Sequence, residues 1–213
     1  MFVLGIDPGL SRCGFGLVRR TRHVQLAVDH GVLQTPPTDE LPARLAAMNA
    51  LLRSLIATHR PDVVVVERVF FQTNARTAMG VAQASGLALA AAHDAGCGIA
   101  QYTSNEVKLA ITGYGGASKD QVQRMVQRIL GLAALPKPAD AADALALALH
   151  HLAIAPLQAR VGNGSGNAEL RVASSVGGAA NATGGLGNAR IATSAGGVRL
   201  AGDVPAGNGG AVR

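Results

Sequence analysis

Residues 62–67 read Asp62-Val63-Val64-Val65-Val66-Glu67, and this run decides the fold class. Consecutive β-branched residues without polar alternation are typical of a strand buried on both faces, as in a parallel sheet covered by helices. A helix is predicted just before the run, from about Asp39 to Thr58, with Pro42 in its first turn. The run therefore predicts an α/β fold. It also places Glu67 at the carboxyl end of a strand, where open α/β sheets have their sites.

The segment that precedes this helix is predicted to form three strands. Short turns that contain Gly or Arg join them, which favours an antiparallel meander. These strands are expected at residues 2–7, 13–20 and 23 to about 34.

The segment after the valine strand is predicted to be mostly helical. Two short helices should begin at the capping boxes Thr103-Ser104-Asn105-Glu106 and Ser118-Lys119-Asp120-Gln121. The other elements are expected at about 73–94 (a helix), 97–103 (a strand) and 139–154 (a last helix). The whole order predicts a mixed α/β sheet, part hairpin and part parallel crossover, flanked by helices.

The composition of the 213-residue chain changes near residue 157. All six Phe and Tyr and all three Lys precede this point, whereas 14 of the 27 glycines follow it. A segment rich in Gly, Ala and Asn cannot bury enough apolar surface to offset the entropy of ordering it. We therefore expect one folded domain at residues 1–156 and a disordered tail at residues 157–213.

The charge balance and the cysteines limit the class of protein. The formal net charge is +6 and the pI is near 10.1, which favours a polyanionic partner such as nucleic acid. Cys13 and Cys97 lie far apart in the sequence and indicate neither a disulfide framework nor a zinc site. Residues 1–7 lack the basic start of a signal peptide, and no apolar run has the length of a membrane span. We expect a cytoplasmic protein.

Four carboxylates carry the chemistry of the sequence. Asp7 ends the first strand, Glu67 ends the valine strand, and Asp140 and Asp143 lie one turn apart on one face of the last helix. Each has a structural alternative. Asp7 can form a turn, the two helical aspartates can serve a helix N-terminus, and Glu67 can mark the point where a buried strand reaches the surface.

Taken together, the four carboxylates favour a metal site. Clustered carboxylates raise one another's pKa unless a cation neutralises them, and hard oxygen ligands without Cys suit Mg²⁺ or Mn²⁺. Two such ions about 3.5–4 Å apart support phosphodiester hydrolysis. A basic protein with an acidic pocket is therefore predicted to be a nuclease that uses Mg²⁺, with two ions in each site.

Four motifs, in the same order and spacing, closely resemble those of the RuvC-type crossover junction endodeoxyribonucleases, the bacterial Holliday-junction resolvases. The motifs are Gly5-Ile6-Asp7-Pro8-Gly9, Glu67-Arg68-Val69-Phe70, Thr112 to Lys119 and Ala139-Asp140-Ala141-Ala142-Asp143-Ala144. The resemblance covers about residues 1–155. It implies a ribonuclease-H-like fold, a homodimer, and symmetric Mg²⁺-dependent nicking of two strands of a four-way DNA junction in recombination and repair. It also implies the branch-migration complex RuvA–RuvB as a partner.

The same resemblance assigns roles to single residues. Asp7, Glu67, Asp140 and Asp143 match the family's four acidic metal ligands and catalytic residues. Lys108 and Lys119 match basic positions that hold the scissile phosphate or stabilise its charge, although each is also explained as a solvated helix-end lysine. Phe70 matches an aromatic residue that stacks on a base at the junction centre, and a core phenylalanine is the alternative.

Two other functions are alternatives to a junction nuclease. Gly5-Ile6-Asp7-Pro8-Gly9 also resembles the phosphate loop of actin-like and sugar-kinase-like ATPases, but those need a second domain for which this chain has no room. A non-catalytic junction-binding architectural protein is the other rival, and it has no need of four acids.

His150 and His151 are too far along the last helix to share a metal with Asp143. We expect them at the helix C-terminus, where His is favoured by the dipole.

Overall fold

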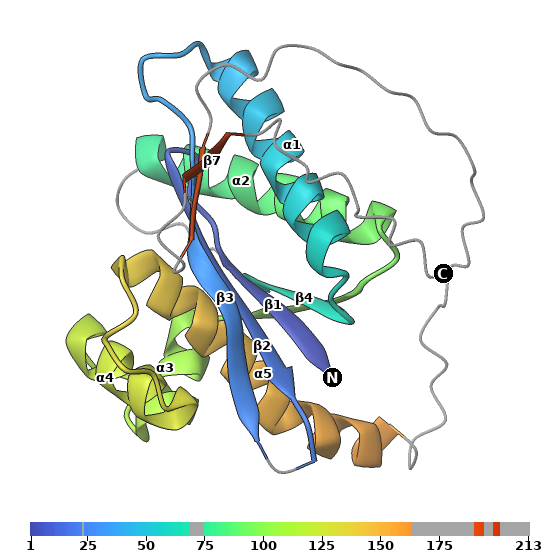
Figure 1. Cartoon of the computed structure of the whole chain (residues 1–213), viewed down its shortest axis with the longest axis vertical. Helices are drawn as coiled ribbons and strands as arrows, with labels where there is room; N and C mark the ends of the chain where they lie inside the picture. Colours follow the sequence, from blue (N-terminus) through green and yellow to red (C-terminus); the bar gives the residue numbers. More distant parts are fainter. Residues whose placement is uncertain (23, 69–74, 163–189, 194–197, 201–213) are drawn as a thin grey trace, which may run out of the picture.

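The computed structural model describes residues 1–22, 24–68, 75–162, 190–193 and 198–200, and a mixed sheet runs through its centre (Figure 1). The strand order is β5-β4-β1-β2-β3-β6-β7. The strands are β1 (Phe2–Asp7), β2 (Arg12–Arg20), β3 (Gln25–Gln34), β4 (Val63–Glu67), β5 (Gly98–Tyr102), β6 (Arg190–Thr193) and β7 (Val198–Leu200). β1, β2 and β3 form the predicted antiparallel meander, and β4 pairs in parallel with both β1 and β5. The predicted α/β class is confirmed.

In the part of the chain that the structure describes, five helices cover the sheet, and their order is the predicted one. They are α1 (Leu41–His59), α2 (Ala75–Asp94), α3 (Ser104–Thr112), α4 (Lys119–Leu130) and α5 (Ala139–Gly162). Both predicted capping boxes are present: the Thr103 and Ser118 side chains each accept a hydrogen bond from the backbone N–H three residues on. α4 ends at Gly131 in the left-handed conformation, as its sequence predicts. No helix within the described residues has the length and apolarity that a bilayer crossing requires.

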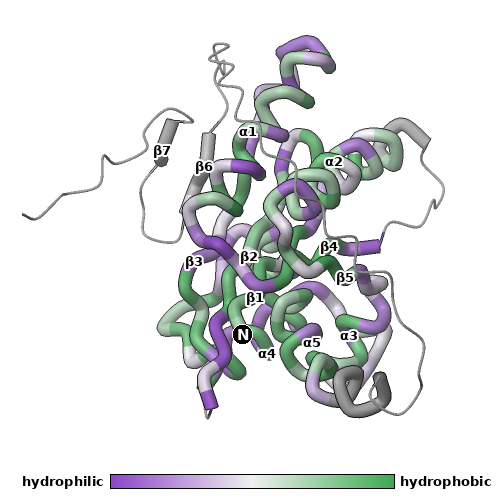
Figure 2. The backbone as a smooth tube through the Cα atoms, turned by 90° about the vertical axis from the view of Figure 1, so that its right-hand side faces the viewer, coloured by the Kyte–Doolittle hydropathy of each residue, from purple (hydrophilic) through white to green (hydrophobic). Residues whose placement is uncertain are grey.

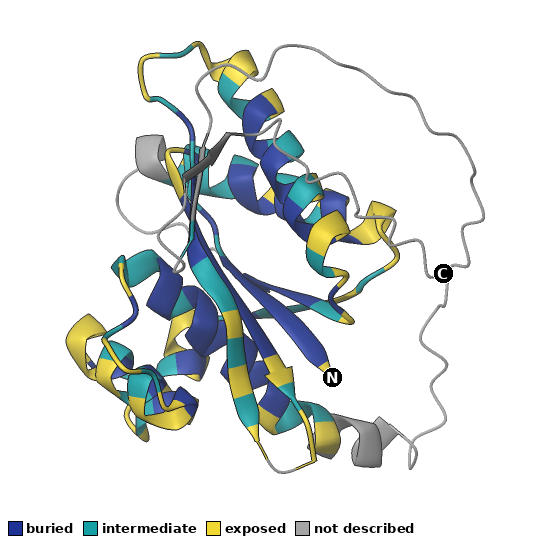
Figure 3. Cartoon of the chain, in the orientation of Figure 1, coloured by how far each residue is buried: buried dark blue, intermediate teal, exposed yellow. Residues whose placement is uncertain are grey.

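The sheet separates two apolar cores. On one face, Leu4 and Ile6 of β1 and Val64 and Val66 of β4 pack under α1 and α2. On the other face, the intervening Val65 packs with residues of α3, α4 and α5. Figure 2 shows these helices on both sides of the hydrophobic central strands, and Figure 3 shows β1 and the middle of α5 buried. The valine run therefore forms a strand that is buried on both faces, as predicted.

The α5 face of the sheet is kept flat by glycines, so that α5 lies directly on the strand backbone. A Cβ atom at Gly5 would lie 1.9 Å from the Ala144 carbonyl oxygen, and one at Gly14 would lie 2.1 Å from the Asp140 carbonyl oxygen. Real side chains do not tolerate such approaches to backbone atoms. The close contact carries the first two turns of α5 to the carboxyl end of β1.

The C-terminal part of the chain contains structure that the sequence did not predict. α5 continues to Gly162 instead of ending near residue 154, although Pro156 lies inside it. Proline has no N–H for the carbonyl four residues earlier, and here the Arg20 guanidinium donates a hydrogen bond to that carbonyl, Leu152 O. The strands β6 and β7 also lie within residues 157–213, where β6 pairs with β3. The rest of that segment lies outside the described residues, so the division near residue 157 stays a prediction.

Candidate active site

Asp7 and Glu67 come together because two neighbouring parallel strands end at the same edge of the sheet. β1 and β4 are paired in register, with Gly5 opposite Val65 and Ile6 opposite Val66. Side chains alternate along a strand, so Asp7 and Glu67 both point to the face covered by α5. Glu67 is near enough to Asp7 to raise the pKa of the Asp7 carboxyl, both through its negative charge and through a hydrogen bond between the two side chains.

Asp140 and Asp143 approach the same point from α5, and each is paired with a cation. The Arg12 Nε donates to Asp140 Oδ2 at 3.0 Å, and the Lys119 Nζ donates to Asp143 Oδ2 at 3.1 Å. The two aspartates are mostly buried, with side-chain exposures of 28% and 25%. The structure thus brings charges from β1, β2, β4, α4 and α5 to one end of the sheet.

A small pocket of about 110 Å³ lies at this end. Its polar lining consists of Asp7, Glu67, Ser104, Lys108, Lys119 and Asp143. Ser104 and Lys119 are the first residues of α3 and α4, so the N-termini of both helices lie at the pocket. Helix N-termini carry partial positive charge and free N–H groups, which favour anions such as phosphate. The pocket therefore combines carboxylates with lysines and helix N-termini that favour a phosphodiester.

Burial and the neighbouring carboxylates raise the pKa of Asp7 to about 9 from an ordinary value of 3.8. Burial is the largest cause, followed by the negative charge of Glu67 and its hydrogen bond, with smaller contributions from Asp143 and Asp140. The same charges raise the pKa of Lys119, chiefly through Asp143. A bound cation at this site would relieve the repulsion between Asp7 and the neighbouring carboxylates.

This pKa predicts how the stability of the metal-free protein depends on pH. Between pH 4 and 9 the unfolded chain releases the Asp7 proton and the folded chain keeps it. The free energy of unfolding therefore decreases as pH rises through this window, by up to about 1.4 kcal/mol per pH unit from this group. We expect urea unfolding in chelator to show a steeper fall from pH 6 to pH 8 for the wild type than for Asp7→Asn. Equal pH dependence in the two proteins would contradict the shift.

The donor set fits a divalent metal ion, although the side chains are not arranged around one. Four carboxylates offer the hard oxygen ligands that Mg²⁺ and Mn²⁺ prefer. Among the described residues, however, no three His, Cys, Asp or Glu side chains are close enough to hold one ion as they stand. Asp140 is paired with Arg12 and Asp143 with Lys119, so one oxygen of each of these carboxylates is engaged by a cationic side chain.

The predicted site residues are distributed as follows. Asp7, Glu67, Asp143, Lys108 and Lys119 line the pocket, and Asp140 lies beside it in contact with Arg12. Phe70 falls in residues 69–74, outside the described residues.

Two residues at the site were missed by the sequence analysis. Ser104 was read only as part of a capping box. Arg12 was given no role, because the strand was expected to begin at residue 13. In the structure Arg12 lies two residues before Gly14, so both are on the α5 face of β2.

The prediction for His150 and His151 was wrong in one respect. They do not lie at a helix C-terminus, because α5 continues for another eleven residues to Gly162. Both are buried against β5: the Tyr102 hydroxyl is 2.8 Å from His151 Nδ1, and the Tyr102 ring meets the His150 ring edge-on. Burial is the main cause that lowers the pKa of each imidazole. They are part of the packing of α5 on the sheet.

A protein-family model matches the sequence of this chain. The model described as crossover junction endodeoxyribonuclease RuvC matches residues 3–151, which is most of the chain. The matched region contains all four carboxylates and both pocket lysines. The resemblance that the four motifs indicate is therefore confirmed.

Relatives from several bacteria carry the same description. The crossover junction endodeoxyribonuclease RuvC of Salinispora arenicola is 54% identical over 154 residues, covering 71% of this chain and 87% of the relative. That of Saccharopolyspora erythraea is 52% identical over 162 residues, covering 76% and 81%. A solved structure of Thermus thermophilus RuvC in complex with a Holliday junction substrate is 36% identical and superposes with a TM-score of 0.70. It covers 74% of this chain and 96% of that chain.

Proposed function

The chain belongs to the RuvC family of crossover junction endodeoxyribonucleases, and from this premise we propose how its residues resolve a Holliday junction. Asp7, Glu67, Asp140 and Asp143 are proposed as the ligands of divalent metal ions and the catalytic residues. The observation that carries this proposal is the meeting of Asp7 and Glu67 at the ends of two parallel strands, with Asp143 lining the same pocket. The raised pKa of Asp7 supports it: burial is the main cause, the nearby carboxylates add to the shift, and a bound cation would relieve their repulsion.

The metal supplies one part of the chemistry. Asp7, Glu67, Asp140 and Asp143 would hold the Mg²⁺ ions, which would supply an activated water and stabilisation of the leaving oxygen. Two ions in each site, with Mn²⁺ as a substitute, remain part of this proposal. The protein supplies the fixed positions of the four carboxylates, which the close packing of α5 on Gly5 and Gly14 determines.

The pocket lysines are proposed to bind the scissile phosphate. Lys119 is exposed and lies at the N-terminus of α4, so it can exchange Asp143 for a phosphate oxygen without being extracted from the core. Lys108 also lines the pocket and belongs to α3, whose N-terminal Ser104 adds a further donor. Together they place positive charge where negative charge develops during cleavage. Phe70, which follows β4, is proposed to stack on a base at the junction centre.

The test of this function is a cleavage assay. Purified protein and Mg²⁺ should nick a synthetic four-way junction at paired, symmetry-related positions and leave ends that ligase can seal. A linear duplex of the same sequence should stay uncut under the same conditions. A protein that binds the junction and never cuts it, whatever the divalent ion, would instead support the non-catalytic architectural alternative.

We also propose a homodimer, because paired nicks on two strands require two active sites. The small-residue helix α2 is the proposed seam, and light scattering of the purified protein tests the mass of the assembly. A contact with the RuvA–RuvB complex follows from the family resemblance and stays a prediction, as does the cytoplasmic location expected from the sequence.

Truncation of the chain tests the proposed division into a nuclease domain and a tail. A chain that ends after Gly162 keeps every proposed site residue and all of α5. It loses β6, which pairs with residues 31–34 of β3 and supplies none of the proposed site residues. We expect junction cleavage within a few fold of the full-length rate in a side-by-side assay. A complete loss of cleavage by the folded, truncated protein would show that the tail is part of the enzyme.

A further inference from the structure

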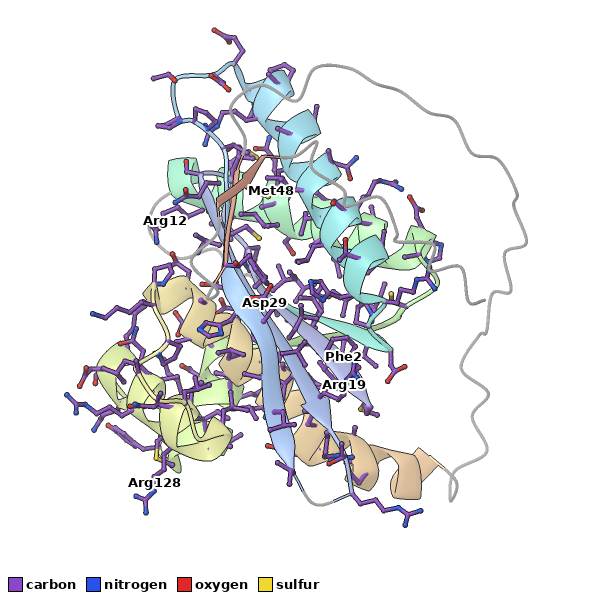
Figure 4. The ribbon with its side chains drawn as sticks, in the orientation of Figure 1. Phe2, Arg12, Arg19, Asp29, Met48 and Arg128 are labelled. Atoms are coloured by element: carbon purple, nitrogen blue, oxygen red, sulfur yellow. The ribbon has the colours of Figure 1, made fainter. Side chains whose placement is uncertain are left out.

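Arg12 is a charged residue of the site to which none of the four motifs assigns a role. It is the first residue of β2, and its Nε donates to Asp140 Oδ2 at 3.0 Å. Half of its side chain is exposed, whereas the Asp140 carboxylate is 28% exposed. Figure 4 shows Arg12 at the end of the sheet near the first turn of α5. The guanidinium therefore reaches the carboxylate from the solvent side.

The register of the sheet explains why Arg12 is held there. Gly14 lies opposite Asp7 in the β1–β2 pair, and it faces the backbone of Asp140. Arg12 precedes Gly14 by two residues, so its side chain leaves the same face of the strand. Arg12 is also paired with Gln34 of β3, which fixes its backbone. The contact with Asp140 thus follows from the main chain and does not require a flexible loop.

This contact engages one of the carboxylate oxygens that a metal ion would need. A guanidinium and a divalent ion both bind carboxylate oxygens strongly, and they repel each other at the distance of one carboxylate. Among the described residues, no three His, Cys, Asp or Glu side chains are arranged to hold one metal ion, which agrees with the pairing of Asp140 with Arg12. A metal ion that binds Asp140 would therefore compete with Arg12 for this carboxylate.

We propose that Arg12 is a positioning residue that acts as a built-in counter-cation: it holds Asp140 in the metal-free protein and leaves it when a divalent ion binds. The inference rests on the proposed role of the four carboxylates as metal ligands. Its consequence is that Arg12 lowers the affinity of the DNA-free protein for Mg²⁺. Removal of the guanidinium should make the site easier to load, although the variant loses a favourable ion pair.

The experiment is a calorimetric titration of metal-free protein with MgCl₂ in the absence of DNA. Arg12→Gln should bind Mg²⁺ about two- to fivefold more tightly than the wild type, the factor expected when a half-exposed ion pair no longer competes. Arg12→Lys keeps the charge and should stay close to the wild type. The matched control is Arg53→Gln, which removes a similarly exposed arginine from its ion pair with Asp94 at the α1–α2 contact. It should leave Mg²⁺ binding unchanged.

A second readout uses the wild-type protein and needs no folded variant. In nitrogen-15 spectra, the Nε–H signal of Arg12 should shift when Mg²⁺ is added, whereas that of Arg53 should not. Equal or weaker Mg²⁺ binding by Arg12→Gln, or an unmoved Arg12 signal at saturating Mg²⁺, would overturn the inference. The proposed function fails separately, if the wild type and Asp7→Asn bind Mg²⁺ equally.

Discussion

Asp7→Asn is expected to reduce the rate of junction cleavage by at least about 10²- to 10³-fold, the loss seen when a group that stabilises transition-state charge is removed. Asp7 is the residue on which the other three acids converge: it is hydrogen-bonded to Glu67 and repelled by Asp143 and Asp140. Asparagine has nearly the same shape but no charge, so the protein should fold and the cation should lose its central ligand. The measurement is the single-turnover rate of nicking with saturating Mg²⁺.

Binding separates this loss from a general defect. Asp7→Asn should retain junction binding in a gel-shift assay, because removal of a negative charge does not weaken attraction to phosphate. Asp94→Asn removes a carboxylate from an exposed ion pair with Arg53, remote from the pocket, and should cleave at the wild-type rate. Cleavage by Asp7→Asn at the wild-type rate would exclude Asp7 from the catalytic residues.

Gly14→Ala is expected to cost the fold about 3 kcal/mol or more of unfolding free energy, at or beyond the usual range for an overpacked core. The new Cβ would lie 2.1 Å from the carbonyl oxygen of Asp140, so α5 must move away from the sheet. Gly5→Ala should act in the same way through Ala144. Because the chain has no Trp, unfolding in urea is followed by circular dichroism.

The matched substitution for this experiment is Gly115→Ala. Its Cβ would lie 3.7 Å from the nearest atom, Asn105 O, which is an ordinary contact, and its φ is not in the left-handed region. We expect a change within about 0.5 kcal/mol. If Gly14→Ala unfolded at the same urea concentration as Gly115→Ala, the tight contact between α5 and β2 would not be needed for stability.

Local sequence patterns were sufficient to predict the elements that depend on contacts between residues close in the sequence. The unbroken valines of β4 require burial on both faces, and the structure provides it. Capping boxes act within four residues, so the starts of α3 and α4 were predicted correctly. The position of Glu67 at a strand end follows from the same reasoning. These signals act over a few residues, and the local structure that they favour is the one present in the fold.

Features that depend on distant contacts were not predictable in this way. Pro156 suggests the end of a helix, and only the hydrogen bond from Arg20 to Leu152 shows why α5 can continue. β6 is a strand because the edge of β3 accepts it, although its own sequence is weak. The role of Arg12 depends on the register between β1 and β2, which no local pattern encodes.

The separation of the acidic residues along the chain has a consequence for synthesis in the cell. Asp7 and Asp143 lie 136 positions apart, yet they share one pocket. At 5–20 residues per second, the ribosome needs roughly 7 to 27 s between them. During that interval the nascent polypeptide holds only part of its ligand set, and α5 has not yet docked on the strands. A nascent chain that has not reached Asp143 therefore lacks the complete set of proposed metal ligands, so we expect no cleavage of DNA before translation of the domain is finished.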